Sequence, residues 1–434
     1  MTYLRADSNF GTRHCLFSMS RNIRKYCGFK EWIFALFLLA NIFKPNPETN
    51  DSSFDLTVFT AAICVILVAW QYFQSRERLF TPVILMLSLF ALFVPTLLWT
   101  DWNSYAVEKA SRFYTLTLLA AIAPIFIVRT ADDLRRFLSG FVFLCSIVAG
   151  TALVVLLGQG DELDRLAVLD ATTIITGRAV GIVILTLGLL WFEPRSKKWL
   201  VGTALVILPT VLVATGAKGP LVATPLALGL CLILFKSGIR RYLSRVLIVC
   251  VLSAATLWFS LPLLPGTSLF RVGTFVLGQF GTSEEDRTTF FADTMNGIVA
   301  NPRGLGLGGF ASKYGVAGGE IREFPHNILL EVFLEGGWFA GLYFTYLLWR
   351  GLKGVYLLGK NGEVAWAYRL LFCFTVFSLL NDLVSGELND SKVLLAFLGL
   401  SIGLAGDSKE KAPAQSGWAS SLPKGTLLTQ DGSS

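Results

Sequence analysis

Charged residues are scarce in this chain of 434 residues. Asp, Glu, Lys and Arg make up 15% of the sequence and hydrophobic residues make up 53%, whereas soluble domains carry about 25% charged residues. A water-soluble fold of this length could not bury so much apolar surface in one core. The composition therefore excludes an ordinary soluble protein and indicates that lipid is the solvent for much of the chain.

Metal ligands are scarce as well. The chain has only two histidines, His14 and His326, and neither lies near a Cys-x-x-Cys pair or a His/Cys cluster. The seven cysteines lie in the N-terminal arm or in apolar segments, where no oxidising compartment would join them. The sequence therefore predicts no metal site, no cofactor and no disulfide.

The apolar residues are gathered in runs close to the ~20 residues that a helix needs to cross a bilayer. We expect an all-α, polytopic integral membrane protein with about twelve spanning helices. The first run is short and the last is weakly apolar, so roughly ten or eleven crossings remain the alternative. The expected spans are 30–44, 56–74, 80–99, 111–128, 137–157, 172–192, 199–215, 219–235, 246–264, 326–349, 364–384 and 391–405.

Lysines and arginines of the short connections fall on one side of this layout. Because cytoplasmic loops carry an excess of these cations, both termini are expected in the cytoplasm. No small-residue cleavage site follows the first span, so we expect that span to be retained. The net charge of +7 comes largely from this bias and gives no support to nucleic-acid binding. The expected organisation is a cytoplasmic arm over 1–29, nine spans over 30–264, a large external loop over 265–325, three spans over 326–405 and a disordered cytoplasmic tail over 406–434.

The large external loop shows signs of internal structure. Ser283 followed by three acidic residues resembles a helix N-cap with an acidic first turn, and apolar residues then recur at helical spacing. We expect a short amphipathic helix over 284–299, lying at the membrane surface and ended by Asn301-Pro302. The glycines of 304–309 follow as a flexible turn.

His326 lies where the loop meets the tenth span, between Pro325 and Asn327. Pro325 suits the first turn of a helix, and the positive end of that helix would favour a neutral imidazole that can accept a proton. A capping or interfacial histidine that only orders the loop is the alternative. Glu331 and Glu335 on the same span turn away from His326, so we expect them to bond to another helix.

Several cations are expected at the external face. Arg178 interrupts the sixth span, where an arginine faces a cavity or partner or extends to the interface. Lys218 occupies a tight external turn between glycines and can either meet an anion or be a simple turn residue. Four arginines of the large loop can bind a phosphorylated ligand or lipid headgroups: Arg271, Arg287, Arg303 and Arg322.

Three segments together resemble the shared motif of the O-antigen ligase and O-antigen polymerase superfamily. They are the proline-and-glycine turn over 301–310, the His326-Asn327 pair opening a helix, and Glu335-Gly336-Gly337-Trp338 on that helix. Arg287 matches an arginine that family members carry upstream. Lys218 lies where many members have an arginine, so it departs from the pattern but keeps the charge.

The resemblance implies a metal-independent, inverting glycosyltransferase with a multi-spanning, GT-C-like architecture in the bacterial inner membrane. The donor would be O-antigen on undecaprenyl diphosphate, and the acceptor would be lipid A–core oligosaccharide at the periplasmic face. One dominant external loop favours the ligase over the O-antigen polymerase or the protein O-oligosaccharyltransferase. A transporter or flippase is the more distant alternative.

The resemblance also implies roles for individual residues. His326 would be catalytic, and Arg178, Lys218, Arg271 and Arg287 would bind the donor diphosphate. Arg303, Arg322 and Asn327 would support the site.

Overall fold

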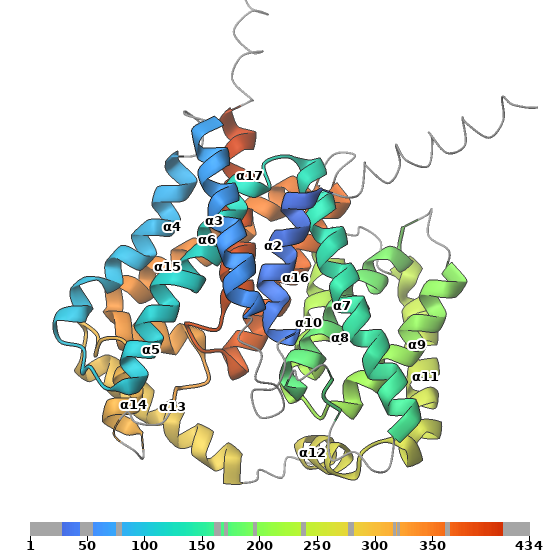
Figure 1. The fold of residues 1–434 in the computed structure, drawn as a ribbon. Coiled ribbons are helices and arrows are strands. Elements are labelled where there is room, and N and C mark those ends of the chain that lie inside the picture. The colour runs from blue at the N-terminus through green and yellow to red at the C-terminus, as the bar shows by residue number, and fades with distance from the viewer. Residues whose placement is uncertain are drawn as a thin grey trace, which may run out of the picture.

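The computed structural model describes residues 28–43, 55–74, 80–159, 166–168, 172–193, 198–235, 240–276, 282–315, 318, 322–360 and 365–410. Within these ranges all regular secondary structure is helical (Figure 1). The predicted cytoplasmic arm over 1–29 and tail over 406–434 lie almost wholly outside the described residues, so both remain predictions.

Each predicted span overlaps a helix, and the large loop contains three more. The longer helices are α2 (Phe29–Leu39), α3 (Leu56–Gln74), α4 (Phe80–Phe93), α5 (Ser104–Arg112), α6 (Leu118–Ile127), α7 (Ala131–Gln159), α8 (Thr173–Trp191), α9 (Lys198–Ala214), α10 (Lys218–Phe235), α11 (Arg240–Ser260), α12 (Gly266–Val276), α13 (Thr282–Ala300), α14 (Gly309–Tyr314), α15 (Ile328–Lys360), α16 (Ala365–Ser385) and α17 (Lys392–Glu410). Short turns extend three of them: η1 (Ala40–Phe43), η2 (Pro95–Leu98) and η5 (Leu261–Leu263).

Eight helical segments among the described residues are long and apolar enough to cross a membrane. Three further apolar helices are shorter: α9, the second half of α11, and α17. Helices suit such sequences because lipid offers no partner to unpaired backbone groups. The prediction of an all-helical membrane protein is thus confirmed, whereas the count of about twelve spans stays a prediction.

Several predicted boundaries are wrong, and α7 and α11 each begin six residues earlier than expected, at Ala131 and Arg240. The fourth span begins at Ser104 rather than 111, because α5, the π-helical turn η3 (Phe113–Thr117) and α6 form one continuous stretch of 24 residues. Asn103 caps its start by accepting a hydrogen bond from the Ala106 N–H at 2.8 Å. At the other ends, α15 runs past 349 to Lys360 and α17 runs past 405 to Glu410.

The helices form two groups joined in the middle (Figure 1). One group contains α3, α4, α5, α6 and α15, and the other contains α7 to α11. Between them lie α2, α16 and α17, and α16 packs against both α10 and α15. The three helices of the large loop lie at the same end of the bundle, α12 beside α9 and α13 and α14 beside α15. The surface helix expected over 284–299 is confirmed as a helix by α13.

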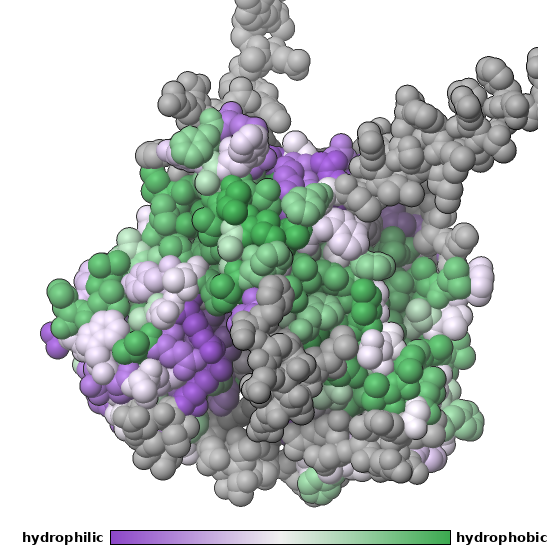
Figure 2. Space-filling model, viewed as in Figure 1, coloured by the Kyte–Doolittle hydropathy of each residue, from purple (hydrophilic) through white to green (hydrophobic). Residues whose placement is uncertain are grey.

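Apolar side chains also cover the outside of the bundle. Figure 2 shows a broad hydrophobic band across this face, with hydrophilic residues above it and in a patch beside α5. Ile66 and Phe73 on α3 and Val154 on α7 are examples, each more than half exposed. Such a surface would be unfavourable in water, and it fits a protein embedded in lipid.

Candidate functional site

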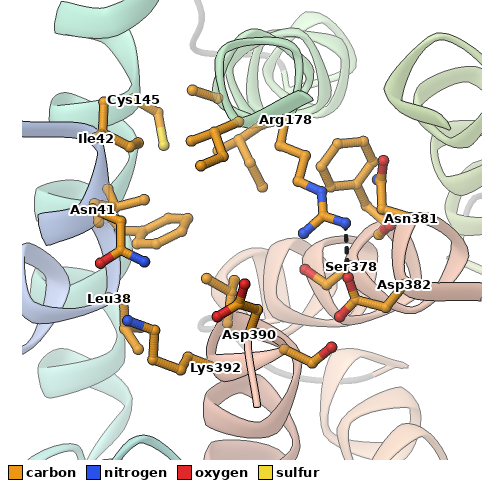
Figure 3. A pocket seen from close by; sticks show the side chains of 18 residues that line it. Leu38, Asn41, Ile42, Cys145, Arg178, Ser378, Asn381, Asp382, Asp390 and Lys392 are labelled. Atoms are coloured by element: carbon orange, nitrogen blue, oxygen red, sulfur yellow. Dashed lines mark hydrogen bonds and ion pairs between the residues drawn. The ribbon is translucent and has the colours of Figure 1, made fainter. Parts of the chain in front are cut away.

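A cavity of about 110 Å³ opens between α2, α7, α8, α16 and the start of α17 (Figure 3). Apolar side chains such as Leu38, Phe141 and Ile182 form most of its wall. A few polar side chains line it as well, among them Arg178, Asn381, Asp382, Asp390 and Lys392. A largely apolar cavity with a few polar groups is the usual form of a ligand site.

Arg178 is held at this cavity by a carboxylate. Its Nη2 lies 2.9 Å from Oδ1 of Asp382 on α16 (Figure 3) and 3.4 Å from the Ser385 hydroxyl. The expectation of a cavity or a partner is therefore confirmed on both counts. The guanidinium has five N–H donors, and its Nε is buried without a hydrogen-bond partner among the described residues. Arg178 thus keeps donors available while Asp382 fixes its orientation.

The turn that carries Lys218 lies against the helix that carries Arg178. A Cβ added to Gly177 would lie 3.1 Å from Ala217 Cβ and 3.2 Å from Thr215 Oγ1, so the close approach depends on a glycine there. Gly216 takes a φ of +61°, which closes the turn before Lys218 opens α10. The structure therefore brings the segments of Arg178 and Lys218 side by side.

Arg271 belongs to a third segment at the same turn. The Ser268 hydroxyl of α12 donates a 2.7 Å hydrogen bond to the carbonyl of Ala214, the last residue of α9. Arg271 follows one helical turn later on α12. Three of the four predicted diphosphate-binding residues thus come from segments that meet around residues 214–218. Arg287 lies on α13, but its side chain is outside the described part of the chain.

His326 has an unusual backbone. It has a φ of +58°, the only positive φ of a non-glycine residue in the described part of the chain. The helix starts after it, at Ile328, and Asn327 caps that start by accepting from the N–H groups of Leu329 and Leu330 at 3.0 and 3.1 Å. The prediction that Pro325 lies in the first helical turn is therefore wrong. Because the Asn327 side chain accepts from the first free N–H groups of the helix, the N-cap is Asn327, two residues after Pro325.

A short stack links His326 to the middle of the molecule. The centroid of its ring lies 4.3 Å from that of the Phe324 ring. The Arg322 guanidinium lies over the same Phe324 ring, 5.7 Å from its centroid. Arg322 in turn bonds to Glu387 and Asp390, with its Nε 2.7 Å from Glu387 Oε2. Burial lowers the pKa of this guanidinium, but the two carboxylates raise its pKa by more, so the charge is retained.

A second cavity, of about 340 Å³, adjoins the first. Arg322, Arg112 and Asn389 line it, and it shares Asn41, Asp390 and Lys392 with the first cavity. Arg303, by contrast, lies over the Trp99 ring at 5.4 Å and is not among the residues that line either cavity. The structure thus connects Arg322 to the site and leaves Arg303 apart from it.

A buried lysine is the main feature that the sequence predictions miss. Lys109 on α5 is fully buried and bonds to both Glu331 and Glu335 of α15, with Nζ 2.7 Å from Glu335 Oε1. The other oxygen of Glu331 accepts the Leu388 N–H at 2.8 Å. The expectation that these glutamates bond to another helix is confirmed. The sequence did contain a sign that Lys109 would be buried, because Ala106 and Ala110 give α5 a small apolar face beside it.

The glycine-rich turn over 301–308 packs against a break in α15. Gly337 takes a φ of 80° and a ψ of 179°, which interrupts the helix. The turn over 301–308 fills the gap, because Leu305 and Gly306 donate to the Leu334 and Glu335 carbonyls at 2.8 and 3.0 Å, and Trp338 donates to Pro302 at 2.9 Å. The predicted flexible turn is therefore tightly packed. It fixes α15 just after the segment that starts at His326.

Among the described residues, no group of three His, Cys, Asp or Glu side chains could hold a metal ion. Residues 203–345 match the family model described as O-Antigen ligase. No curated protein matches the chain. The matched region contains the Lys218 turn, the three helices of the large loop, His326 and the break in α15. Over this region the chain is therefore similar to the O-antigen ligase family, and the match supports the resemblance seen in the sequence.

Proposed function

We propose that this protein is an O-antigen ligase with a GT-C-like architecture. It would transfer O-antigen polysaccharide from undecaprenyl diphosphate to lipid A–core oligosaccharide at the periplasmic face of the bacterial inner membrane. The observation that carries the proposal is that the region matching the family model also contains residues that adjoin the candidate site. The matched region contains both the Lys218 turn and His326, and a largely apolar cavity holding Arg178 lies beside that turn.

The donor's chemistry suits the first cavity. Its polyprenyl chain needs an apolar wall, and its diphosphate needs cations. Arg178 would supply one cation, oriented by Asp382, and Lys218 and Arg271 would supply two more from the adjoining segments. Arg287 on α13 is the fourth predicted contact to this group. Such contacts stabilise the charge that develops as the diphosphate leaves.

The reaction is a single displacement at the anomeric carbon. The acceptor hydroxyl attacks this carbon, its proton passes to an imidazole nitrogen of His326, and undecaprenyl diphosphate leaves with the electrons of the broken C–O bond. Inversion follows because no covalent intermediate forms. General-base help of this kind contributes about 10²–10⁴-fold. The Phe324–Arg322 stack and the Asn327 cap would hold His326 in place, with no metal or cofactor taking part.

Purified protein tests the proposal directly. It is given an undecaprenyl-diphosphate-linked glycan with lipid A–core, an unextended lipid-linked repeat unit, or a protein as acceptor, each with and without EDTA. We expect glycan transfer to lipid A–core at an unchanged rate in EDTA. Transfer only to the repeat unit or only to protein would make the chain a polymerase or a protein O-oligosaccharyltransferase instead. Movement of the donor across liposomes without transfer would make it a flippase.

A further inference from the structure

The second cavity differs in character from the first. It lies beside α5, where Figure 2 shows hydrophilic residues gathered on the surface, and its lining includes Thr57, Arg112, Arg322, Asn389, Asp390 and Lys392. A hydroxyl, an amide, a carboxylate and three cations offer both donors and acceptors of hydrogen bonds. An apolar lipid chain cannot form hydrogen bonds with these groups, so a polar ligand fits this cavity better.

Two of the cations at this cavity are neutralised by carboxylates. Arg322 bonds to Glu387 and Asp390, and Arg112 lies 2.6 Å from Glu108 and 4.0 Å from Asp390. Carboxylates also line this cavity, so an anion bound there would meet like charge as well as opposite charge. A neutral saccharide instead requires closely spaced donors and acceptors, because each hydroxyl both donates and accepts. The balance of charge therefore favours a sugar over a second anion.

Asn389 provides an unfilled hydrogen-bonding position. It is 3% exposed and lines the cavity, and its Oδ1 has no hydrogen-bond partner among the described residues. Its backbone is fixed, since the Thr117 hydroxyl donates to the Asn389 carbonyl at 2.7 Å. A buried acceptor without a partner is unfavourable. A donor from a bound ligand would satisfy it.

The two cavities meet at Asn41, Asp390 and Lys392. We infer that the polar cavity is a saccharide site that holds the acceptor glycan, with Asn389 accepting a hydrogen bond from a sugar hydroxyl. The donor in the apolar cavity and the acceptor in the polar one would then meet at this junction. That the sugar is the acceptor rests on the proposed function, whereas saccharide binding itself does not.

Asn381 offers a matched control. It too is a buried asparagine whose Oδ1 has no partner among the described residues, but it lines the first cavity and not the second. The ligand for binding is the core oligosaccharide freed from lipid A by mild acid, measured by saturation-transfer NMR on purified protein in detergent. We expect Asn389→Ala to weaken binding by about three- to tenfold, and Asn381→Ala to leave it unchanged. Melting temperatures of both variants check folding.

Steady-state transfer provides the second measurement. Asn389→Ala should raise KM for lipid A–core by a similar factor and leave KM for the lipid-linked donor unchanged. If the protein has no transferase activity but binds the oligosaccharide, and Asn389→Ala weakens that binding, the saccharide site is supported and the proposed function is refuted. Active protein in which Asn389→Ala changes neither binding nor the acceptor KM would refute the site and leave the function standing. Equal loss in both asparagine variants at unchanged melting temperature would also refute it.

Discussion

His326 is held in a conformation that side chains with a Cβ seldom adopt. The left-handed region costs about 1–2 kcal/mol for such residues, so the surroundings must hold it there. The Phe324 ring on one side and the Asn327 cap on the other do so. Strained backbone of this kind occurs often at functional sites, which fits a catalytic residue better than an interfacial one.

Replacing His326 separates a base from an orienting group. His326→Ala and His326→Gln should both lower transfer by about 10²–10⁴-fold, because neither side chain accepts a proton at neutral pH. Initial rates are measured with purified protein, and donor binding is measured alongside as the control for folding. Near-normal transfer by the glutamine variant would leave only an orienting role. Near-normal transfer by the alanine variant would remove His326 from the mechanism.

Lys218 tests the diphosphate cradle. A charge-assisted contact is worth roughly 1.5–3 kcal/mol, so Lys218→Ala should lower transfer about ten- to a hundredfold. Lys218→Arg keeps the charge and should retain more activity. The rates are compared at saturating acceptor. If the alanine and arginine variants lose activity equally, geometry at this turn matters more than charge.

Individual residues were predictable where their own chemistry stood out. Arg178 within an apolar run was expected to face a cavity or a partner, with extension to the interface as the alternative, and the two glutamates of α15 were expected to bond to another helix. Their partners were not predictable, because Lys109 lies 222 residues from Glu331 and one sequence carries no record of contacts. The cap at Asn327 was missed because Pro325 is an equally good sign of a helix start.

At the scale of elements, buried charge fastens α5 to α15. Removing Lys109 leaves two glutamates buried and uncompensated, which costs about 3–5 kcal/mol. Lys109→Met should therefore lower the melting temperature in detergent, and the triple variant with Glu331→Gln and Glu335→Gln should recover much of it. Lys353→Met, at an exposed lysine over the Trp349 ring, is the control. An unchanged melting temperature for Lys109→Met would contradict the role of this ion pair.

The break in α15 makes a second test of the element. A Cβ at Gly337 would lie 2.6 Å from the Arg303 carbonyl carbon, and its φ of 80° disfavours any side chain. Gly337→Ala should therefore destabilise the protein by about 1–3 kcal/mol. Gly150→Ala is the matched control, because nothing lies within 4 Å of its added Cβ. Equal melting temperatures for the two variants would mean that the 301–308 turn yields easily.

The runs of apolar residues predicted the positions of the helices well, except where charged residues lie within a span. Glu108 and Lys109 interrupt the apolar pattern, so the fourth span was expected only from 111. In the structure, Lys109 and Arg112 both have carboxylate partners, and the helix begins at Ser104. The break at Gly337 was not predictable either, since glycines in a span indicate close packing as readily as a kink.

Across the whole molecule, the large loop and the ends of the site should face the periplasm. Cysteines placed at Lys218 and Glu284 should react with a membrane-impermeant thiol reagent in cells whose outer membrane has been opened, because the cation bias puts these positions outside. A cysteine at Lys360 should stay protected until the inner membrane is lysed. The reverse pattern would invert the topology.

The contact between α5 and α15 has a consequence for how the protein is made. Lys109 is synthesised and enters the membrane long before Glu331 and Glu335, its carboxylate partners, leave the ribosome. During that interval a cation in a spanning segment has no carboxylate from α15 beside it, which is unfavourable within a membrane. The first half of the bundle therefore cannot reach its final stability alone. Nascent chains that stop before residue 331 should remain with the insertion machinery or be degraded, whereas chains that extend past residue 335 should be released.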